Sequence, residues 1–141
     1  GIRSARLYIC GLGLYEAFID EKPILFARAK TKEYLAYLVD RGTLCTTAQI
    51  AAALGGDISD SYIRKLRKDL FDTFRAAGCG DVLIQQWNKQ GIRTDLVDCD
   101  FYDWKRGLPG AINSYHGEYM TQYDFAEETR AALWQQLPSA D

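Results

Sequence analysis

The sequence predicts a mixed α+β fold in which a small antiparallel sheet precedes three helices and a β-hairpin. Short apolar runs broken by glycines open the chain, apolar residues then recur every three or four positions, and two strand-like runs flank a later polar turn. The 141 residues suit one domain, or one small domain with an appendage. A hydrophobic fraction of 48% is ample for a packed core, which excludes a disordered tail.

Two short strands are predicted at residues 5–10 and 14–19, separated by Gly11 and Gly13. After a polar turn, residues 23–26 form a third strand, which is placed at a sheet edge because its first residue is proline. The opening segment is therefore expected to form a small antiparallel sheet.

Two helices with their own start and stop signals follow the sheet. Thr31 is expected to cap the first helix, which ends at Gly42. Thr46 and Gln49 have the capping-box spacing of a second helix, which ends after Leu54.

The third helix is predicted over residues 59–77 and is the most informative element of the chain. Its core-facing stripe consists of Ile63, Leu66, Leu70 and Phe74. The residues that point away from this stripe are Ser61, Arg64, Lys65 and Lys68, with Arg67 on the flank. Four of the five residues 64–68 are positively charged in a protein whose net charge is −2. A basic outer face of this kind is suited to an anionic partner, and nucleic acid is the leading candidate.

A β-hairpin is predicted directly after the third helix. Residues 82–87 form its first strand, residues 88–91 a polar turn and residues 92–97 its second strand. Trp87, like Tyr15, is expected in the core rather than on a surface that stacks on bases. A sheet, three helices and a hairpin wing in this order describe a winged helix-turn-helix.

The last third of the chain differs in charge. Residues 1–93 contain 14 Lys/Arg against 10 Asp/Glu, whereas residues 94–141 contain 3 against 9. One helix is expected to begin at Pro109 and another at an Asp124–Glu127 capping pair. Their apolar side chains are Ile112, Tyr115, Tyr119, Phe125, Leu133 and Trp134. Because two helices alone cannot bury a full apolar face, they pack on the preceding domain or on a second copy, so a homodimer through these helices is a hypothesis.

The sequence argues against a membrane protein, an enzyme or a metalloprotein. No apolar run approaches the roughly 20 residues that span a membrane, and four scattered cysteines fit buried thiols in a reducing cytoplasm. His116 has no obvious nucleophile partner, so no catalytic residue is predicted. Asp98, Asp100 and Asp103 lack the glycine and final glutamate of an EF-hand loop and are expected in a solvated linker. No cofactor or metal is expected.

Three runs resemble the DNA-binding domain of OmpR/PhoB-type response regulators of bacterial two-component systems, and within that group the SARP-like regulators. They are ICG at the end of the opening strand, KTKEYLAYLV in the first helix and IRKLRKDL in the third. Residues 98–102 (DCDFY) and 117–123 (GEYMTQY) are similar to the linker and first helices of the bacterial transcriptional activation domain. The resemblance implies a winged-helix DNA-binding domain at residues 5–97 and a helical extension at residues 98–137.

The chain departs from this family in three respects, one of which is that the receiver domain with its phospho-acceptor aspartate is missing. The family's wing usually reads Arg-Gly-x-Gly-Tyr, where this chain has NKQGI at residues 88–92. Lys89 or Arg93 is expected to replace the arginine that enters the minor groove. The tryptophan usual at the end of the second helix is also absent, since Gly55 follows Leu54. The chain is expected to be the effector part of a longer regulator.

The resemblance implies that the basic helix enters the major groove with its N-terminal half first. The charges agree with this orientation, because Asp69 and Asp72 lie further along the helix and would be repelled by phosphate. Lys65 aligns with a base-reading position and is flanked by Ser61 and Lys68. The expected phosphate contacts are Arg64, Arg67, Tyr62, and Thr31 and Thr46 at two helix N-termini. The expected wing contacts are Asn88, Lys89 and Arg93.

These residues predict sequence-specific binding of double-stranded DNA by the effector domain of a bacterial transcriptional regulator. RNA polymerase is a further expected partner. A protein–protein interaction module that uses the same scaffold without binding DNA is the alternative. The two differ in one observable, since only the first binds duplex DNA with a steep salt dependence.

Overall fold

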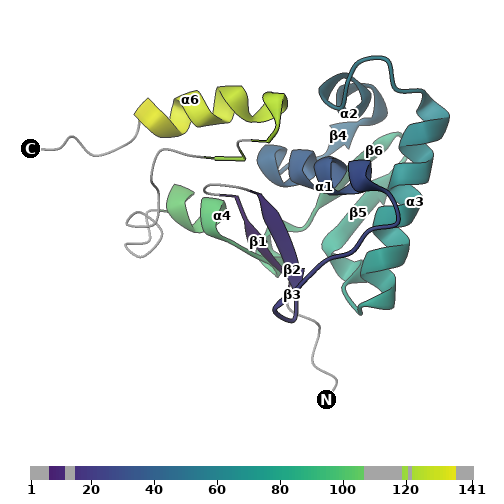
Figure 1. Cartoon of the computed structure of the whole chain (residues 1–141), viewed down its shortest axis with the longest axis horizontal. Helices are drawn as coiled ribbons and strands as arrows, with labels where there is room; N and C mark the ends of the chain where they lie inside the picture. Colours follow the sequence, from purple (N-terminus) through teal and green to yellow (C-terminus); the bar gives the residue numbers. More distant parts are fainter. Residues whose placement is uncertain (1–6, 12–14, 107–118, 121, 136–141) are drawn as a thin grey trace, which may run out of the picture.

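A computed structural model describes residues 7–11, 15–106, 119–120 and 122–135, and it has the predicted mixed α+β composition (Figure 1). One sheet has the strand order β3-β2-β1-β7 and the other the order β4-β6-β5. The helices are α1 (Ala29–Arg41), α2 (Thr47–Ala53), α3 (Asp60–Ala76), α4 (Asp100–Lys105) and α6 (Glu127–Gln135). Helix α1 lies in the middle of the molecule, with α3 on one side and α6 on the other.

The first sheet is larger than predicted. Strand β1 (Leu7–Cys10) pairs antiparallel with β2 (Glu16–Ile19) and parallel with β7 (Val97–Cys99). The predicted third strand at 23–26 is too long, because only β3 (Lys22–Pro23) pairs with β2 before the chain turns toward α1. Strand β7 was not predicted. The proposed boundary between residues 97 and 98 therefore falls inside a strand of this sheet.

Helix α1 begins three residues earlier than predicted. Its N-cap is Arg28, and Thr31 lies inside the helix, so the expectation that Thr31 caps it is wrong. Thr31 is buried and its hydroxyl donates a 2.6 Å hydrogen bond to Asp69 Oδ2 of α3. The end at Gly42 is confirmed, with a φ of 67° that favours glycine.

Helices α2 and α3 form as predicted. Thr46 and Gln49 make the expected capping box at the start of α2. Ser59 caps α3, since its Oγ accepts a 3.1 Å hydrogen bond from the Tyr62 N–H. The predicted stripe of α3 is fully buried and consists of Ile63, Leu66, Leu70 and Phe74.

The hairpin is confirmed, but its turn lies one residue earlier and is shorter. Strands β5 (Leu83–Gln86) and β6 (Lys89–Ile92) are joined by Trp87 and Asn88, so the predicted turn at 88–91 and return strand at 92–97 are wrong. Gly91 lies inside β6, where an added Cβ would approach the Thr43 carbonyl oxygen to 3.2 Å. Gly91 therefore allows two backbone segments to approach each other closely, and it is not part of the turn.

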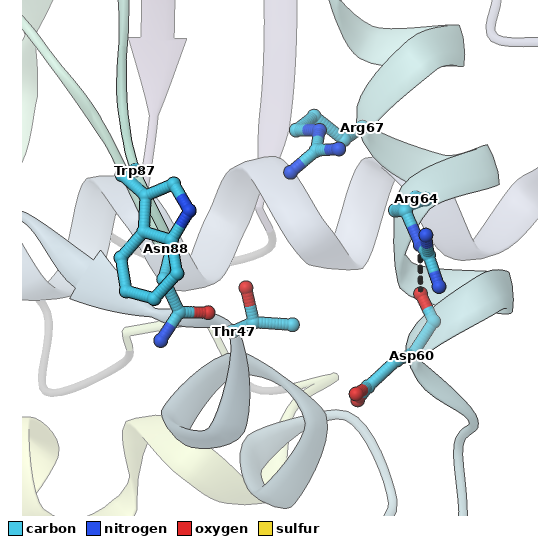
Figure 2. Close-up of a pocket in the computed structure, with 6 residues that line it drawn as sticks. All are labelled: Thr47, Asp60, Arg64, Arg67, Trp87 and Asn88. Atoms are coloured by element: carbon cyan, nitrogen blue, oxygen red, sulfur yellow. Dashed lines mark hydrogen bonds between the residues drawn. The ribbon is translucent and has the colours of Figure 1, made fainter.

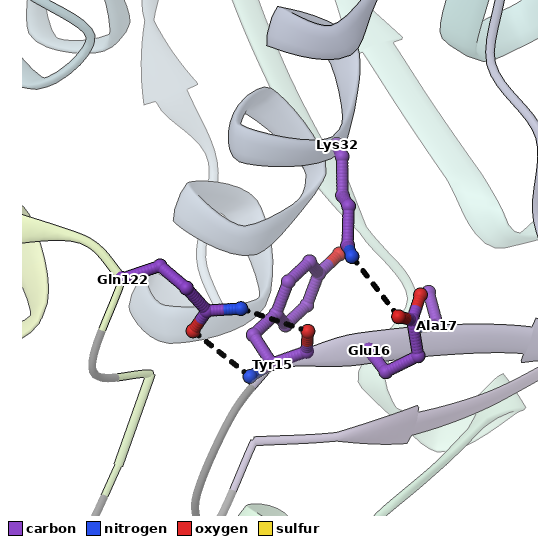
Figure 3. A network of polar contacts seen from close by, with 5 residues as sticks. All are labelled: Tyr15, Glu16, Ala17, Lys32 and Gln122. Carbon is purple, nitrogen blue, oxygen red and sulfur yellow. Dashed lines mark hydrogen bonds and ion pairs between the residues drawn. The ribbon is translucent and has the colours of Figure 1, made fainter.

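The segment after residue 97 packs on the rest of the chain. Residues 100–105 form α4, so the expectation of a solvated linker is wrong, and Asp100 Oδ1 accepts a 2.7 Å bond from the Gly11 N–H. The Gln122 side chain makes two hydrogen bonds to the Tyr15 backbone (Figure 3). The Tyr119 hydroxyl donates a 3.0 Å bond to Asp40 of α1.

Part of the predicted helical extension lies outside the described residues. This holds for the helix expected from Pro109, including Ile112, Tyr115 and His116, and for the side chain of Trp134. Helix α6 begins at Glu127 after a 3₁₀ turn at Asp124–Ala126, so Asp124 is not the cap that its spacing predicted. Phe125 and Leu133 do pack on the core, as expected.

Candidate nucleic-acid interface

The outer face of α3 is basic and exposed, as the sequence predicts. The exposed side chains are Ser61, Arg64, Lys65 and Lys68, and Arg67 is half-buried on the flank. They lie opposite a stripe that is fully buried against α1 and α2, so the packing of α3 determines the direction in which they point. The structure therefore brings the predicted base-contact and arginine phosphate-contact residues together on one helix face.

The cations on this face differ in their partners. Lys68 Nζ lies 2.6 Å from Asp72 Oδ2, one turn along the same helix. Among the residues that the structure describes, no carboxylate lies within ion-pair distance of Arg64, Lys65 or Arg67. Arg64 Nε donates a 3.5 Å hydrogen bond to the Asp60 carbonyl oxygen (Figure 2), but none of these three side chains forms an ion pair with a described residue, whereas the charge of Lys68 is shared with Asp72.

A groove separates the first turns of α3 from the tip of the hairpin (Figure 2). Its volume is about 420 Å³ and it is open to solvent. The lining residues are Thr47, Asp60, Arg64, Arg67, Trp87 and Asn88. Two guanidinium groups and one carboxylate give the groove a net positive charge.

The hairpin tip is held to the start of α2 by backbone contacts. The Thr47 N–H donates a 3.3 Å hydrogen bond to the Asn88 carbonyl, and the short strand β4 (Cys45–Thr46) pairs with Gln90 and Lys89 of β6. Asn88 has a φ of 59°, a left-handed conformation that asparagine tolerates better than most residues. Because α2 also packs on α3, the tip has a defined position relative to the basic helix face.

Trp87 is not a core residue, contrary to the sequence-based expectation. Its side chain is 92% exposed at the hairpin tip, where it forms one wall of the groove. The error follows from placing the turn too late, which assigned Trp87 to a strand. The two exposed glutamines before it, Gln85 and Gln86, are a signal that this strand leaves the core before it reaches the tryptophan.

The three predicted wing residues are not grouped. Asn88 and Lys89 are exposed at the tip. Arg93 follows the last residue of β6, and its N–H bonds to the Val82 carbonyl at the base of the hairpin. Arg93 therefore lies at the opposite end from the tip, and the expectation that it stands beside Asn88 and Lys89 is wrong.

The remaining predicted phosphate contacts have different surroundings. Tyr62 is half-buried, with the Arg28 guanidinium 5.9 Å from its ring centre. Thr46 Oγ1 accepts the capping bond from the Gln49 N–H, which leaves the hydroxyl proton for another acceptor. Thr31 is buried and its hydroxyl is committed to Asp69, so its predicted phosphate contact is wrong.

Asp69 anchors the start of α1 to the middle of α3 rather than facing outward. Its carboxylate accepts hydrogen bonds from the backbone N–H groups of Ala27 and Arg28 and from the hydroxyls of Thr31 and Thr73. Partial burial acts to raise the pKa of Asp69, but these hydrogen bonds outweigh it and hold the pKa below its ordinary value of 3.8. Asp69 therefore orients α3 on α1.

Replacing Asp69 by asparagine is expected to lower the free energy of unfolding by about 1–3 kcal/mol, because an amide cannot accept all of these bonds. The folded-state pKa of Asp69 is depressed, so its contribution is present above the unfolded pKa and is lost as the pH falls through the folded value. Urea melts of both proteins at several pH values measure this. The difference between them should shrink below about pH 4, and a constant difference would contradict the assignment.

In the described part of the chain, no three Asp, Glu, His or Cys side chains are grouped so that they could bind a metal. None of the described helices combines the length and apolar character needed to cross a membrane.

Comparison with solved structures shows that the fold occurs in a known protein. The chain superposes on Mycobacterium tuberculosis EmbR, solved in complex with a low-affinity phosphopeptide, with a TM-score of 0.73 and 19% sequence identity. The match covers 95% of this chain and 43% of the EmbR chain. No model of a known protein family matches the chain, and a search of curated proteins finds no match. The chain thus has a mixed α+β fold similar to that of EmbR and spans less than half of the EmbR chain.

Proposed function

We propose that this chain is the double-stranded DNA-binding effector domain of a bacterial transcriptional regulator of the OmpR/PhoB or SARP-like type. In this role it is a winged helix-turn-helix: the N-terminal half of α3 enters the major groove, and the tip of the β5–β6 hairpin lies at the adjacent minor groove. The role is non-catalytic and needs no cofactor.

The observation that carries the proposal is the outward basic face of α3 beside the hairpin. Arg64, Lys65 and Arg67 lack acidic partners among the described residues, although the whole chain has a net charge of −2. A major groove can admit an α-helix, and a cluster of cations without ion-pair partners on such a helix is suited to the phosphates of a duplex. The fold is similar to that of EmbR, and this similarity supports the proposed role as a regulator domain.

The proposal is tested by fluorescence anisotropy of the purified chain with random-pool duplex DNA at two salt concentrations, followed by selection of the bound sequences. We expect binding that weakens steeply with salt and selection of a recurring half-site. A chain that binds no duplex at low salt would leave the alternative, a protein-interaction module on this scaffold.

Replacing Lys65 by alanine is expected to relax the preference for one base pair, at a cost of about 1–3 kcal/mol for the preferred sequence. Lys65 is exposed on the outermost line of α3 and lacks a described acidic partner, so it is the residue best placed to reach base edges. Selection experiments on both proteins measure the change. Arg75→Ala, near the far end of the same helix and outside the groove, is the matched control, and an equal relaxation of sequence preference in both variants would contradict the base contact by Lys65.

The partners of the C-terminal segment remain a proposal. Tyr119 and Phe125, whose apolar character suggested a homodimer, pack on α1 of the same chain, so this argument for a second copy no longer holds. We retain a homodimer and RNA polymerase as proposed partners. The spacing of selected half-sites, together with light scattering, distinguishes a dimer from a monomer.

A further inference from the structure

We propose that the Trp87 indole packs against a deoxyribose of the DNA strand that separates the major groove, entered by α3, from the minor groove at the hairpin tip. This role for Trp87 rests on the proposed DNA-binding function and assigns the contact made from the hairpin side. Trp87 is 92% exposed and lies across the groove from Arg64 and Arg67 (Figure 2).

The geometry of B-DNA identifies the occupant of the groove. The major groove is about 12 Å wide and admits an α-helix, and the adjacent minor groove is about 6 Å wide. One sugar–phosphate strand separates the two grooves. A protein that inserts α3 into the major groove and holds a hairpin tip at the adjacent minor groove must leave space for that strand. The groove of about 420 Å³ lies at this place.

The two walls of the groove suit the two sides of such a strand. Arg64 and Arg67 on the α3 wall present guanidinium groups, which bind phosphate oxygens with directed hydrogen bonds. Trp87 on the hairpin wall presents a large, flat apolar surface, and a deoxyribose presents C–H groups between successive phosphates. Asp60 also lines the groove and repels a phosphate at the start of α3, so the phosphate lies toward Arg67.

The backbone that carries Trp87 is held in place before DNA arrives. The hairpin's two-residue turn is tied to α2 through the Thr47–Asn88 backbone bond, so little backbone ordering is needed on binding. An indole this exposed contributes little to the fold, and Trp87 can therefore be replaced without loss of stability.

The test compares the wild type, Trp87→Ala and Leu25→Ala by anisotropy with one duplex at several salt concentrations. Leu25 is 88% exposed and does not line the groove, which makes it the matched control. Trp87→Ala should weaken binding about tenfold at every salt concentration with an unchanged slope of log K against log salt, because an apolar contact releases no counterions. Leu25→Ala should bind like the wild type.

Intrinsic fluorescence gives a second readout that a purely structural role would not produce. Duplex DNA should change the tryptophan emission of the wild type with the same midpoint as the anisotropy, and Trp87→Phe should abolish that change. Unaltered binding by Trp87→Ala, a flattened salt slope, or an emission change that survives in Trp87→Phe would each overturn the contact while DNA binding stands. A wild type that binds no duplex would overturn both proposals.

Discussion

Replacing Tyr119 by alanine is expected to lower the free energy of unfolding by about 3–5 kcal/mol, the largest stability effect we predict. Tyr119 is fully buried, its ring centre lies 4.6 Å from that of Phe101, and its hydroxyl bonds to Asp40 of α1. Its removal opens a cavity between α4 and α1 and leaves the Asp40 carboxylate without this donor. Chemical denaturation measures the loss, and Leu25→Ala should change stability by less than about 0.5 kcal/mol.

The variant Tyr119→Phe isolates the hydrogen bond from the packing of the ring. Burial raises the pKa of Asp40, and the bond from Tyr119 partly offsets this rise. Burial also raises the pKa of Tyr119 well above 10, so its hydroxyl remains a donor. The bond is strongest to the charged carboxylate, so Tyr119→Phe should cost more as the pH rises through the Asp40 pKa.

These two variants also test whether the C-terminal segment is part of the folded unit. Wild-type stability of Tyr119→Ala would mean that this segment does not stabilise the rest of the chain. A pH-independent cost of Tyr119→Phe would instead show that the ring matters and the hydrogen bond to Asp40 does not.

Replacing both Arg64 and Arg67 by alanine is expected to weaken binding to every duplex by about 100-fold at ~0.15 M salt, the largest binding effect we predict. Both guanidinium groups line the groove through which a DNA strand is proposed to run, and neither has an acidic partner among the described residues. The loss of two phosphate contacts should also flatten the slope of log K against log salt by about two. Anisotropy titrations over a range of salt concentrations measure both quantities.

A control with the same change in net charge separates local contact from general electrostatics. Lys22 lies in β3 and Arg75 near the end of α3, and both are exposed and outside the groove. The double variant Lys22→Ala/Arg75→Ala should lose far less affinity than the Arg64/Arg67 variant and keep a nearly unchanged salt slope. Equal losses would show that the chain's overall charge, rather than the groove, drives binding.

The basic helix and its face could be predicted because their signals are local. The stripe of Ile63, Leu66 and Leu70 repeats at helical spacing, and the caps at Ser59 and Thr46 depend on residues three positions away. The basic side chains then follow from geometry, since they occupy the remaining face of the same helix. Their roles toward base or phosphate stay predictions.

The groove could be predicted only in part. Arg64 and Arg67 belong to the predicted basic face, which forms one wall of the groove. Trp87 was expected in the core, because a one-residue error in the turn places its side chain in a strand instead of at the hairpin tip. Thr47 and Asp60 line the groove because α2, α3 and the hairpin tip surround it, an arrangement that the periodicity of either helix does not reveal.

Contacts between residues far apart in the chain account for the other differences. Thr31 is a good cap by type, yet it is buried because Asp69, 38 residues away, accepts its hydroxyl. Asp100 belongs to a helix rather than a linker, and it bonds to Gly11, 89 residues away. Tyr119 bonds to Asp40, 79 residues away in the chain.

Local spacing encodes helices, caps and the basic face, since each depends on neighbours within a turn or two. Burial, strand partners and the exposure of Trp87 depend on which distant segments pack together, and they become visible only in the tertiary structure.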